Sequence, residues 1–395
     1  MEQRDVVVLS GVRTAIGDFG GGLKDRPPTE LSAAVVREAV KRAGIKPEEV
    51  EHVVFGNVIH TDVHDMYLAR VAAINGGLSV DTPALTLNRL CGSGLQAIVS
   101  AAQTILLGDA RVAIGGGAEV MSRSAYWVPN ARWGQRMGDG KLIDAMVGAL
   151  SDPFDDCHMG ITAENVAAKW GISRIAQDEL AVQSHQRATA AIRAGYFKDQ
   201  ILPIEYKVKG QTVVFDTDEH VKADTSLEKL AKLRPAFKSG DGTVTAGNAS
   251  GINDAAAAVV LMEAGEAQRR GLRPLGRLVA YAHAGVDPKY MGIGPVPAVR
   301  KVLERANLSI KDIDVIELNE AFAAQALAVM RDLDLPADRT NPNGSGIALG
   351  HPIGATGCIL TVKALYELRR TGGKYALVTM CIGGGQGIAA IFEAL

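Results

Sequence analysis

The stretch Asn88-Arg89-Leu90-Cys91-Gly92-Ser93-Gly94-Leu95-Gln96-Ala97 joins two segments with different apolar patterns. Residues 83–87 form a short apolar run, whereas residues 95–107 carry apolar side chains at helical spacing. Cys91 is therefore expected at a strand-to-helix elbow, where two glycines let the backbone turn sharply. The free N–H groups of a helix N-terminus favour an anion, which biases such a cysteine toward the nucleophilic thiolate. The alternative is a buried structural thiol, because free cysteines are among the most buried residues.

Length and composition predict a cytoplasmic enzyme. A chain of 395 residues is long enough for two or three units with their own cores, and its 47% hydrophobic and 22% charged residues are typical of soluble proteins. The formal charge of −2 gives no general attraction to nucleic acid or to an anionic membrane. We expect no secretory leader and no apolar stretch of about 18 residues. The four cysteines form no CxxC pair, so we expect reduced thiols and no metal site: Cys91, Cys157, Cys358 and Cys381.

The first part of the chain alternates short apolar runs with helical patterns. Residues 6–9 and 53–55 are expected as strands, and residues 31–43 as a helix that ends near Gly44. Residues 111–114 are expected as a strand that stops at Gly115-Gly116-Gly117. This alternation predicts an α/β core with strands covered on both faces.

The middle of the chain has a different composition. Residues 121–249 contain all three tryptophans, a charged helix-like run at 177–194 and turn clusters near Gly210 and Gly240. We interpret this segment as a large insertion with its own helices. The small-residue run at 255–261 that follows it is predicted as a tightly packed helix.

The last part of the chain repeats the first. Residues 36–45 match 299–308, residues 49–55 match 312–318 at the same spacing, and residues 113–117 match 381–385. Between these matches each half has a glycine-containing elbow that opens a helix, one with Cys91 and the other with His351. Two related halves stacked on each other would bring Cys91 and His351 together at a pseudo-twofold interface.

Three further motifs indicate chemistry rather than packing. His351 is held between Gly350 and Pro352, although a lone histidine is often only a hydrogen-bonded core residue. In Cys381-Ile382-Gly383-Gly384-Gly385 a thiol at a strand end precedes exposed backbone amides. In Asn319-Glu320-Ala321-Phe322 a polar pair interrupts an apolar strand-to-helix junction; Asn319 could serve there as the N-cap of a helix over 321–330.

With these blocks in this order, the whole chain resembles the thiolases of the acetoacetyl-CoA-forming subgroup. It is especially similar to the bacterial β-ketothiolases that supply polyhydroxyalkanoate precursors. The resemblance implies a duplicated thiolase-type α/β fold, with two stacked mixed-sheet βαβαβαββ halves and a large inserted loop domain. It implies an N-terminal half at 1–120 plus 250–273, an inserted loop domain at 121–249 for CoA binding and oligomerisation, and a C-terminal half at 274–395.

The resemblance also implies the activity, an acetyl-CoA C-acyltransferase that condenses acyl-CoA with acetyl-CoA reversibly to 3-ketoacyl-CoA and CoA. His351 would take the proton of Cys91, whose thiolate would then attack a thioester to form an acyl-enzyme. Cys381 would remove an α-proton from acetyl-CoA. One oxyanion hole would use His351 and a water held by Asn319, and the other the backbone N–H groups of Cys91 and Gly383.

Matching family positions imply the coenzyme A contacts, with CoA as a substrate and no tightly bound cofactor. They are His158, Met159, Lys222, Phe237, Ala246, Ser250, Met291 and Phe322. Ser250 could equally be a turn residue. Lys222 stands where relatives often carry arginine, so the positive charge is kept but bidentate phosphate recognition is lost. The loop at 121–140, with Tyr126, Trp127 and Trp133, is implied to form a homotetramer, a dimer of dimers; a local aromatic core is the alternative.

Three other functions compete with this interpretation. A decarboxylating ketoacyl synthase would need histidine or asparagine in place of Cys381, because it forms its enolate by losing CO2. A non-catalytic CoA- or lipid-binding protein would not need Cys91, His351 and Cys381 together. A cysteine hydrolase offers no role for the second thiol.

Overall fold

Two similar groups of strands form the framework of the computed structural model, which describes residues 4–395. Residues Val6 to Val8 of the first group pair with residues Gly276 to Leu278 of the second, so hydrogen bonds connect the two groups into one continuous sheet path. The first group has the order β1 (Val6–Thr14), β13 (Asn253–Glu263), β5 (Val112–Val120), β3 (His52–Gly56) and β4 (Ala84–Leu87). The second has the order β14 (Gly276–Gly285), β17 (Gln386–Ala394), β16 (Tyr375–Ile382) and β15 (Val315–Leu318).

The strand pairing repeats between the two groups. In the first, β3 and β5 are parallel, and β13 is antiparallel to both β5 and β1. In the second, β15 and β16 are parallel, and β17 is antiparallel to both β16 and β14. A single bridge from Ile316 to Thr340 occupies the place that β4 has beside β3. The predicted duplicated α/β fold is therefore confirmed.

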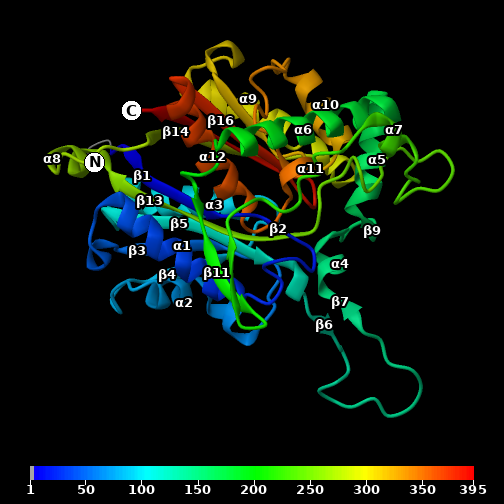
Figure 1. Cartoon of the computed structure of the whole chain (residues 1–395), viewed down its shortest axis with the longest axis horizontal. Helices are drawn as coiled ribbons and strands as arrows, with labels where there is room; N and C mark the ends of the chain where they lie inside the picture. Colours follow the sequence, from blue (N-terminus) through cyan, green and yellow to red (C-terminus); the bar gives the residue numbers. More distant parts are fainter. Residues whose placement is uncertain (1–3) are drawn as a thin grey trace.

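Helices cover the outer faces of both groups and also fill the space between them. On the first group, α1 (Pro28–Ala43) contacts β1 and β13, and α2 (Leu68–Asn75) contacts β3 and β4. On the second, α9 (Pro295–Ala306) contacts β14 and β17, and α10 (Ala323–Asp332) packs beside it. The helices α3 (Ser93–Leu107) and α12 (Thr356–Thr371) contact each other in the middle, between the blue-cyan half and the yellow-red half of Figure 1.

The two central helices cross where their backbones touch. A Cβ atom on Gly94 of α3 would lie 2.7 Å from the backbone nitrogen of Cys358, and one on Gly357 of α12 would lie 2.2 Å from the backbone nitrogen of Leu95. Only glycine permits this approach. Because each helix begins at its elbow, the crossing brings the Cys91 elbow and the His351 loop to the centre of the molecule.

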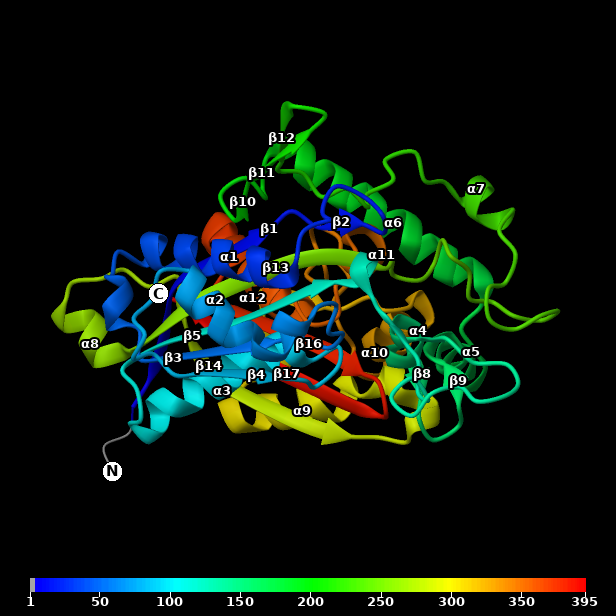
Figure 2. The same ribbon diagram turned by 90° about the horizontal axis from the view of Figure 1, so that it is seen from below.

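The prediction of a helix over 255–261 was wrong, because this run lies in β13. Strand β13 pairs with β1 on one side and with β5 on the other, and its residues from Asn253 to Met262 are buried. Alanine has the highest helix propensity, but such propensities differ by less than about 1 kcal/mol per residue for most residues, and pairing on both edges of a buried strand outweighs them. Figure 2 shows β13 as a long strand running beside β1 and β5.

The predicted strand end at Gly115-Gly116-Gly117 was also wrong, since all three glycines lie inside β5. A Cβ atom on Gly115 would lie 2.7 Å from Cα of Ile98, and one on Gly117 would lie 2.1 Å from the carbonyl oxygen of Gly354. These glycines let α3 and the loop before α12 approach the sheet. The strand register also corrects the predicted match of residues 113–117 with 381–385. Ala113 pairs with His52, and Ala376 pairs with Val315, which is the counterpart of His52 in the second half. The counterpart of Ala113 is therefore Ala376 and not Cys381.

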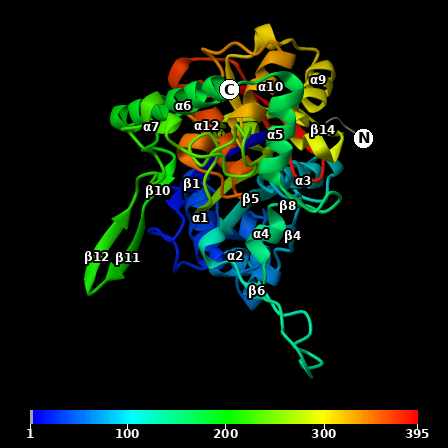
Figure 3. The same cartoon turned by 90° about the vertical axis from the view of Figure 1, so that its right-hand side faces the viewer.

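A long segment between β5 and β13 carries most of the additional elements. Helix α6 confirms the predicted helix at 177–194 and is longer by a few residues at its N-terminus, where Ser173 Oγ caps it. Figure 3 shows the hairpin of β11 and β12 and the loop between β6 and β7 projecting from the body of the molecule. The segment contains η3 (Met121–Arg123), β6 (Tyr126–Trp127), β7 (Ile143–Asp144), α4 (Ala145–Ala149), β8 (Ser151–Asp152), β9 (Cys157–His158), α5 (Met159–Trp170), α6 (Arg174–Ala194), β10 (Ile201–Leu202), β11 (Ile204–Val208), β12 (Gln211–Phe215) and α7 (Leu227–Ala231).

Short elements complete the fold. They are β2 (Gly17–Asp18), η1 (Pro47–Glu49), η2 (Val63–Tyr67), α8 (Ala264–Arg269), η4 (Pro288–Ile293), η5 (Ile310–Asp312) and α11 (Gly346–Leu349). Of these, β2 pairs with the start of β13 and so lies beside the point where the long segment between β5 and β13 ends.

One apolar segment has the length of a membrane span, which the sequence interpretation did not expect. The window Leu90–Leu107 spans 18 residues with a mean hydropathy of 1.5. It consists of the Cys91 elbow and α3, is 61% buried inside the fold, and packs on β3, β5 and α12. Its apolar composition is thus accounted for by its position in the core between the two halves.

Candidate active site

A cavity of about 410 Å³ lies where the two halves meet the long segment between β5 and β13. Cys91 comes from the first half, His351 and Phe322 come from the second, and the segment between β5 and β13 supplies His158 and Phe237. The remaining lining is mostly apolar: Asp18, Phe19, Met121, Leu150, Met159, Ala236, Ala246, Ala249, Ser250, Gly251, Ile252, Met291, Ala321 and Ile353.

Cys91 lies at the elbow just before α3. Helix α3 begins at Ser93 with Gly92 in the N-cap position. The Ser93 hydroxyl accepts a hydrogen bond from the Arg89 backbone N–H (2.8 Å) and donates one to the Leu90 carbonyl oxygen (2.7 Å), which fixes the turn. The backbone N–H groups of Cys91 and Gly383 both donate toward the Cys91 thiol.

The pKa of Cys91 contradicts the predicted bias toward thiolate. Burial raises the pKa of this thiol, and Glu119, whose own pKa burial raises to about 8, adds a smaller upward shift once it is ionised. The two backbone N–H groups oppose this shift without overcoming it. The free N–H groups of α3 belong to residues after Cys91, and the low-dielectric surroundings penalise a bare thiolate. The resting thiol is therefore protonated and needs a base before it can attack.

His351 is buried with a defined proton arrangement. Its Nδ1 lies 2.7 Å from Thr356 Oγ1, and that hydroxyl donates its only proton to the Pro352 carbonyl oxygen at 3.0 Å. Nδ1–H must therefore donate to Thr356, which leaves Nε2 unprotonated, with its lone pair as an acceptor. Burial lowers the pKa of His351 to about 4, so the ring is neutral at physiological pH. A neutral imidazole with an unprotonated Nε2 can accept a proton.

Asn319 lies beside the His351 ring. Its Nδ2 is 3.4 Å from Nδ1 and 3.3 Å from Nε2, and its Oδ1 is buried without a hydrogen-bond partner among the described residues. Helix α10 begins at Ala323 with Phe322 in the N-cap position, so Asn319 is not the cap of this helix. The orphaned Oδ1 is a polar atom free to interact with a water or a ligand group.

Cys381 is the second thiol near the cavity and is fully buried. It lies next to the last residue of β16 and belongs to an apolar cluster with Met159, Met291 and Phe322, which themselves line the cavity. Burial raises the pKa of Cys381, and the proximity of Cys91 adds to this effect. Gly383, in the turn that follows β16, is also buried, whereas the sequence predicted exposed backbone amides after Cys381.

Aromatic rings form one wall of the cavity. The rings of His158 and Phe237 stack with centroids 4.6 Å apart, and Phe237 meets Phe322 edge-on at 6.2 Å. His158 is also the N-cap of α5, because its Nδ1 accepts a hydrogen bond from the Gly160 backbone N–H at 3.0 Å. Such a flat apolar wall suits an extended chain of methylene and amide groups.

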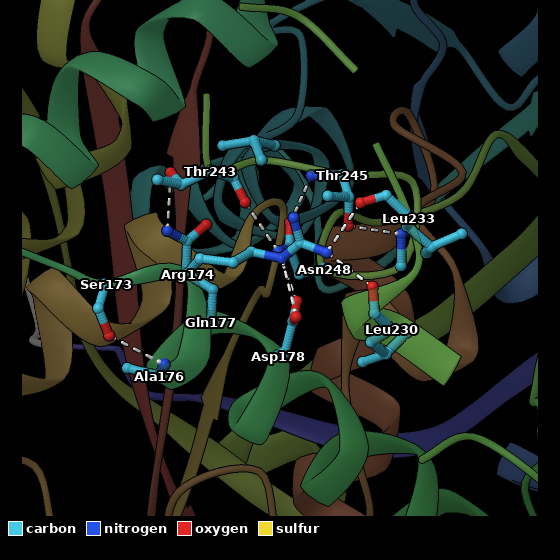
Figure 4. A network of polar contacts seen from close by, with 12 residues as sticks. Ser173, Arg174, Ala176, Gln177, Asp178, Leu230, Leu233, Thr243, Thr245 and Asn248 are labelled. Carbon is cyan, nitrogen blue, oxygen red and sulfur yellow. Dashed lines mark hydrogen bonds and ion pairs between the residues drawn. The ribbon is translucent and has the colours of Figure 1, made fainter. Parts of the chain in front are cut away.

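A buried polar network holds the neighbouring segment that contains Ala246 and Ser250 (Figure 4). Asn248 donates to Asp178 Oδ1 (2.9 Å) and to the Thr243 carbonyl oxygen, and accepts from the Thr245 backbone N–H (2.8 Å). Asp178 is in turn paired with Arg174 at 2.8 Å on the same helix. The network fixes this loop against α6, so its residues reach the cavity from a rigid support.

Seven of the eight predicted coenzyme A contacts line the cavity, and Lys222 does not. Its Nζ instead pairs with Asp18 Oδ2 at 3.2 Å. Asp18 and Phe19 line the cavity but were missed by the sequence interpretation. Three consecutive glycines at 20–22 are typical of a loop. No local sequence pattern indicates that this loop reaches the same cavity as Cys91.

Comparison with known proteins identifies the family of the chain. The model of the thiolase N-terminal domain matches residues 6–265, and that of the thiolase C-terminal domain matches residues 272–394. The chain is 68% identical to the β-ketothiolase BktB of Cupriavidus necator, over 99% of this chain and 100% of that protein. It is 52% identical to an acetyl-CoA acetyltransferase of Chromobacterium violaceum, over 98% and 99% of the two chains.

Solved structures show the same fold. A crystal structure of the Bacillus anthracis acetyl-CoA acetyltransferase has a TM-score of 0.97 at 49% identity, and the alignment covers 100% of this chain and 99% of that one. Human mitochondrial 3-ketoacyl-CoA thiolase in complex with CoA has a TM-score of 0.96 at 48% identity, with 100% and 98% covered. The chain therefore belongs to the thiolase family.

Proposed function

We propose that Cys91, His351 and Cys381 carry out the chemistry of a β-ketothiolase in this chain. As a member of the thiolase family, the chain is an acyltransferase that condenses an acyl-CoA with acetyl-CoA reversibly to a 3-ketoacyl-CoA and CoA. The observation that supports these residue roles is the lining of one cavity by Cys91 and His351, with Cys381 in the apolar cluster of its wall. The second thiol also favours proton abstraction over decarboxylation.

In the first half-reaction, His351 Nε2 takes the proton of the Cys91 thiol as the sulfur attacks the thioester carbon. The C–S bond to CoA then breaks, and the departing CoA sulfur takes a proton from Cys381. The products are acyl-Cys91, free CoA, a protonated His351 and a Cys381 thiolate. The thioester oxygen carries negative charge in the transition state, and the backbone N–H groups of Cys91 and Gly383 are suited to stabilise it.

In the second half-reaction, the Cys381 thiolate removes an α-proton from acetyl-CoA. The buried position that raises the pKa of Cys381 makes its thiolate a strong base, as abstraction from carbon requires. The enolate carbon attacks acyl-Cys91, a C–C bond forms, and the Cys91 sulfur leaves and regains its proton from His351. His351 and a water held by the free Oδ1 of Asn319 would stabilise the enolate oxygen.

The chemistry uses coenzyme A thioesters as substrates and needs no tightly bound cofactor, since thiols and imidazole supply nucleophile and base. We place the pantetheine arm along His158, Met159, Phe237, Ala246, Ser250, Met291 and Phe322. We further propose a cytoplasmic homotetramer that supplies polyhydroxyalkanoate precursors. The division into 1–120 plus 250–273, 121–249 and 274–395 also remains our proposal, supported by the end of β5 at Val120 and the start of β13 at Asn253.

Two cysteine variants test the residue roles. After exposure to acetyl-CoA, intact-protein mass spectrometry should find no acetyl group on Cys91→Ala. Cys381→Ala should still acquire the acetyl group, more slowly because the departing CoA sulfur lacks its proton donor, but form no acetoacetyl-CoA, because the α-proton acceptor is missing. Cys157→Ala is the control, since Cys157 lies outside the cavity lining, and it should behave like the unaltered protein. Normal acetylation of Cys91→Ala would contradict the proposed nucleophile.

A further inference from the structure

The cavity has an acidic residue at its open end. Within residues 4–395, Asp18 is the single carboxylate that lines the cavity, and no lysine or arginine lines it. The neighbouring Phe19 is 56% exposed, whereas His351 is buried, so Asp18 marks the solvent side. Coenzyme A carries several phosphate charges at the end remote from its thioester, and a carboxylate at the rim would repel them.

Asp18 binds two basic side chains. Its Oδ1 lies 2.8 Å from His220 Nδ1 and also accepts a hydrogen bond from the Phe19 backbone N–H at 3.1 Å. Its Oδ2 lies 3.2 Å from Lys222 Nζ. The hydrogen bond from His220, together with the nearby Lys222 ammonium group, holds the pKa of Asp18 well below its usual range, so the carboxylate is ionised at neutral pH.

Backbone contacts hold both partners independently of their ion pair. Glu219 Oε2 accepts hydrogen bonds from the Asp18 backbone N–H (2.9 Å) and from the Gly22 backbone N–H (3.1 Å). The Lys222 backbone N–H donates to His185 Nδ1 at 3.1 Å on α6. These hydrogen bonds join two segments distant in sequence beside the rim. They hold the backbones of Asp18 and Lys222 in place whether or not the two side chains pair.

We propose that Asp18 is a specificity-determining residue that neutralises Lys222 at the rim of the cavity. The inference rests on the proposed function. An ammonium group paired with a carboxylate has little net attraction for phosphate, so recognition depends on the apolar cavity around the pantetheine arm. The substrate class therefore extends to acyl-pantetheine thioesters that lack the nucleotide.

The test measures how strongly the protein prefers a donor with a nucleotide. Acetylation of Cys91 is followed by intact-protein mass spectrometry at low concentrations of acetyl-CoA or of S-acetylpantetheine, and the ratio of the two second-order rate constants is taken. Asp18→Asn keeps an oxygen for His220 and Phe19 but removes the charge that holds Lys222. We expect the ratio to rise about fivefold, as for one partly exposed charge near a phosphate.

Two further variants complete a charge cycle. Lys222→Met removes the ammonium partner of Asp18 and leaves only the hydrogen bond from His220, so the ratio should fall by a similar factor, and the double variant should return close to the unaltered protein. Asp338→Asn removes the same charge from an exposed loop outside the cavity lining and should not change the ratio. Because each ratio compares two donors on one protein sample, a partly unfolded variant does not imitate the effect.

Distinct results would overturn the inference. If Asp18→Asn lowers the ratio, Asp18 presents Lys222 to the phosphates instead of neutralising it. If all variants share one ratio, the rim does not sense the nucleotide. Acetylation of the unaltered protein in either case would leave the proposed function standing, whereas no acetylation by either donor would overturn that function and this inference with it.

Discussion

Thr356 determines which nitrogen of His351 is available as a base. Its hydroxyl donates to the Pro352 carbonyl oxygen and so can only accept from His351 Nδ1–H. The lone pair of His351 is thereby held on Nε2, and burial keeps the ring neutral by lowering its pKa to about 4. This arrangement compensates for the raised pKa of Cys91, because the thiol can lose its proton to a base that remains unprotonated at neutral pH.

At the residue scale we predict that Thr356→Val slows acetylation of Cys91 on the order of tenfold or more, because Nδ1–H loses its acceptor and the wrong tautomer becomes accessible. Rapid-quench acetylation with acetyl-CoA measures the rate. Thr361→Val is the matched control: Thr361 is buried on the same helix and its hydroxyl donates to the Gly357 carbonyl oxygen, away from His351. Equal rates in the two variants would contradict the tautomer argument.

The crossing of α3 and α12 is the element-level feature that assembles the site. Both helices begin next to a functional loop, and their backbones touch at Gly94 and Gly357. A residue with a side chain at either position would have to move one helix, since the atoms in its way belong to the backbone of the other. Such a movement would carry Cys91 away from His351, because each residue lies next to the start of one of the two helices.

At the element scale, Gly357→Ala should destabilise the protein by about 3 kcal/mol, because its Cβ would lie 2.2 Å from the Leu95 backbone nitrogen. Urea unfolding followed by circular dichroism measures the change. Gly148→Ala is the control, as this glycine is also helical but its Cβ would meet no atom nearer than 3.8 Å. A Gly357→Ala variant as stable as Gly148→Ala would show that the close crossing is not required.

The whole molecule exposes apolar side chains on the loop between β6 and β7. Trp133 is 84% exposed and Met137 is 93% exposed, and Tyr126 and Trp127 of β6 are also exposed. These residues do not form the local aromatic core that the sequence left open as an alternative. The loop projects away from the two halves (Figure 1), and apolar side chains so exposed suit an interface with further copies of the chain.

At the scale of the whole molecule, the double variant Trp133→Ser with Met137→Ser should convert the proposed tetramer into dimers, since both side chains would lose the apolar contact that holds the dimers together. Light scattering coupled to size-exclusion chromatography measures the mass. Val214→Ser, on the other projecting segment β12, is the control and should leave the mass unchanged. A double variant that keeps the mass of the unaltered protein would exclude this loop as the contact.

Local sequence patterns alone determined many of the strands and helices, the duplication of the fold and the motifs of the site. Apolar periodicity identified the strands at 6–9 and 53–55 and the helices at 31–43, 95–107 and 177–194, because each pattern reflects one buried face of one element. The repeated spacing of the two halves predicted the duplication. The motifs around Cys91, Asn319, His351 and Cys381 predicted the chemistry, since glycine and proline beside a reactive side chain constrain the backbone whatever the surroundings.

The tertiary structure decided what depends on contacts between distant segments. Pairing on both sides made residues 253–263 a strand despite their alanines, and close packing placed the glycines at 115–117 inside β5. Burial raised the pKa of Cys91 where the helix end alone predicted a lower one. The pairing of Asp18 with Lys222 joins positions far apart in sequence. Burial, strand pairing and charge pairing depend on contacts across the whole packed chain, so no local sequence pattern could predict them.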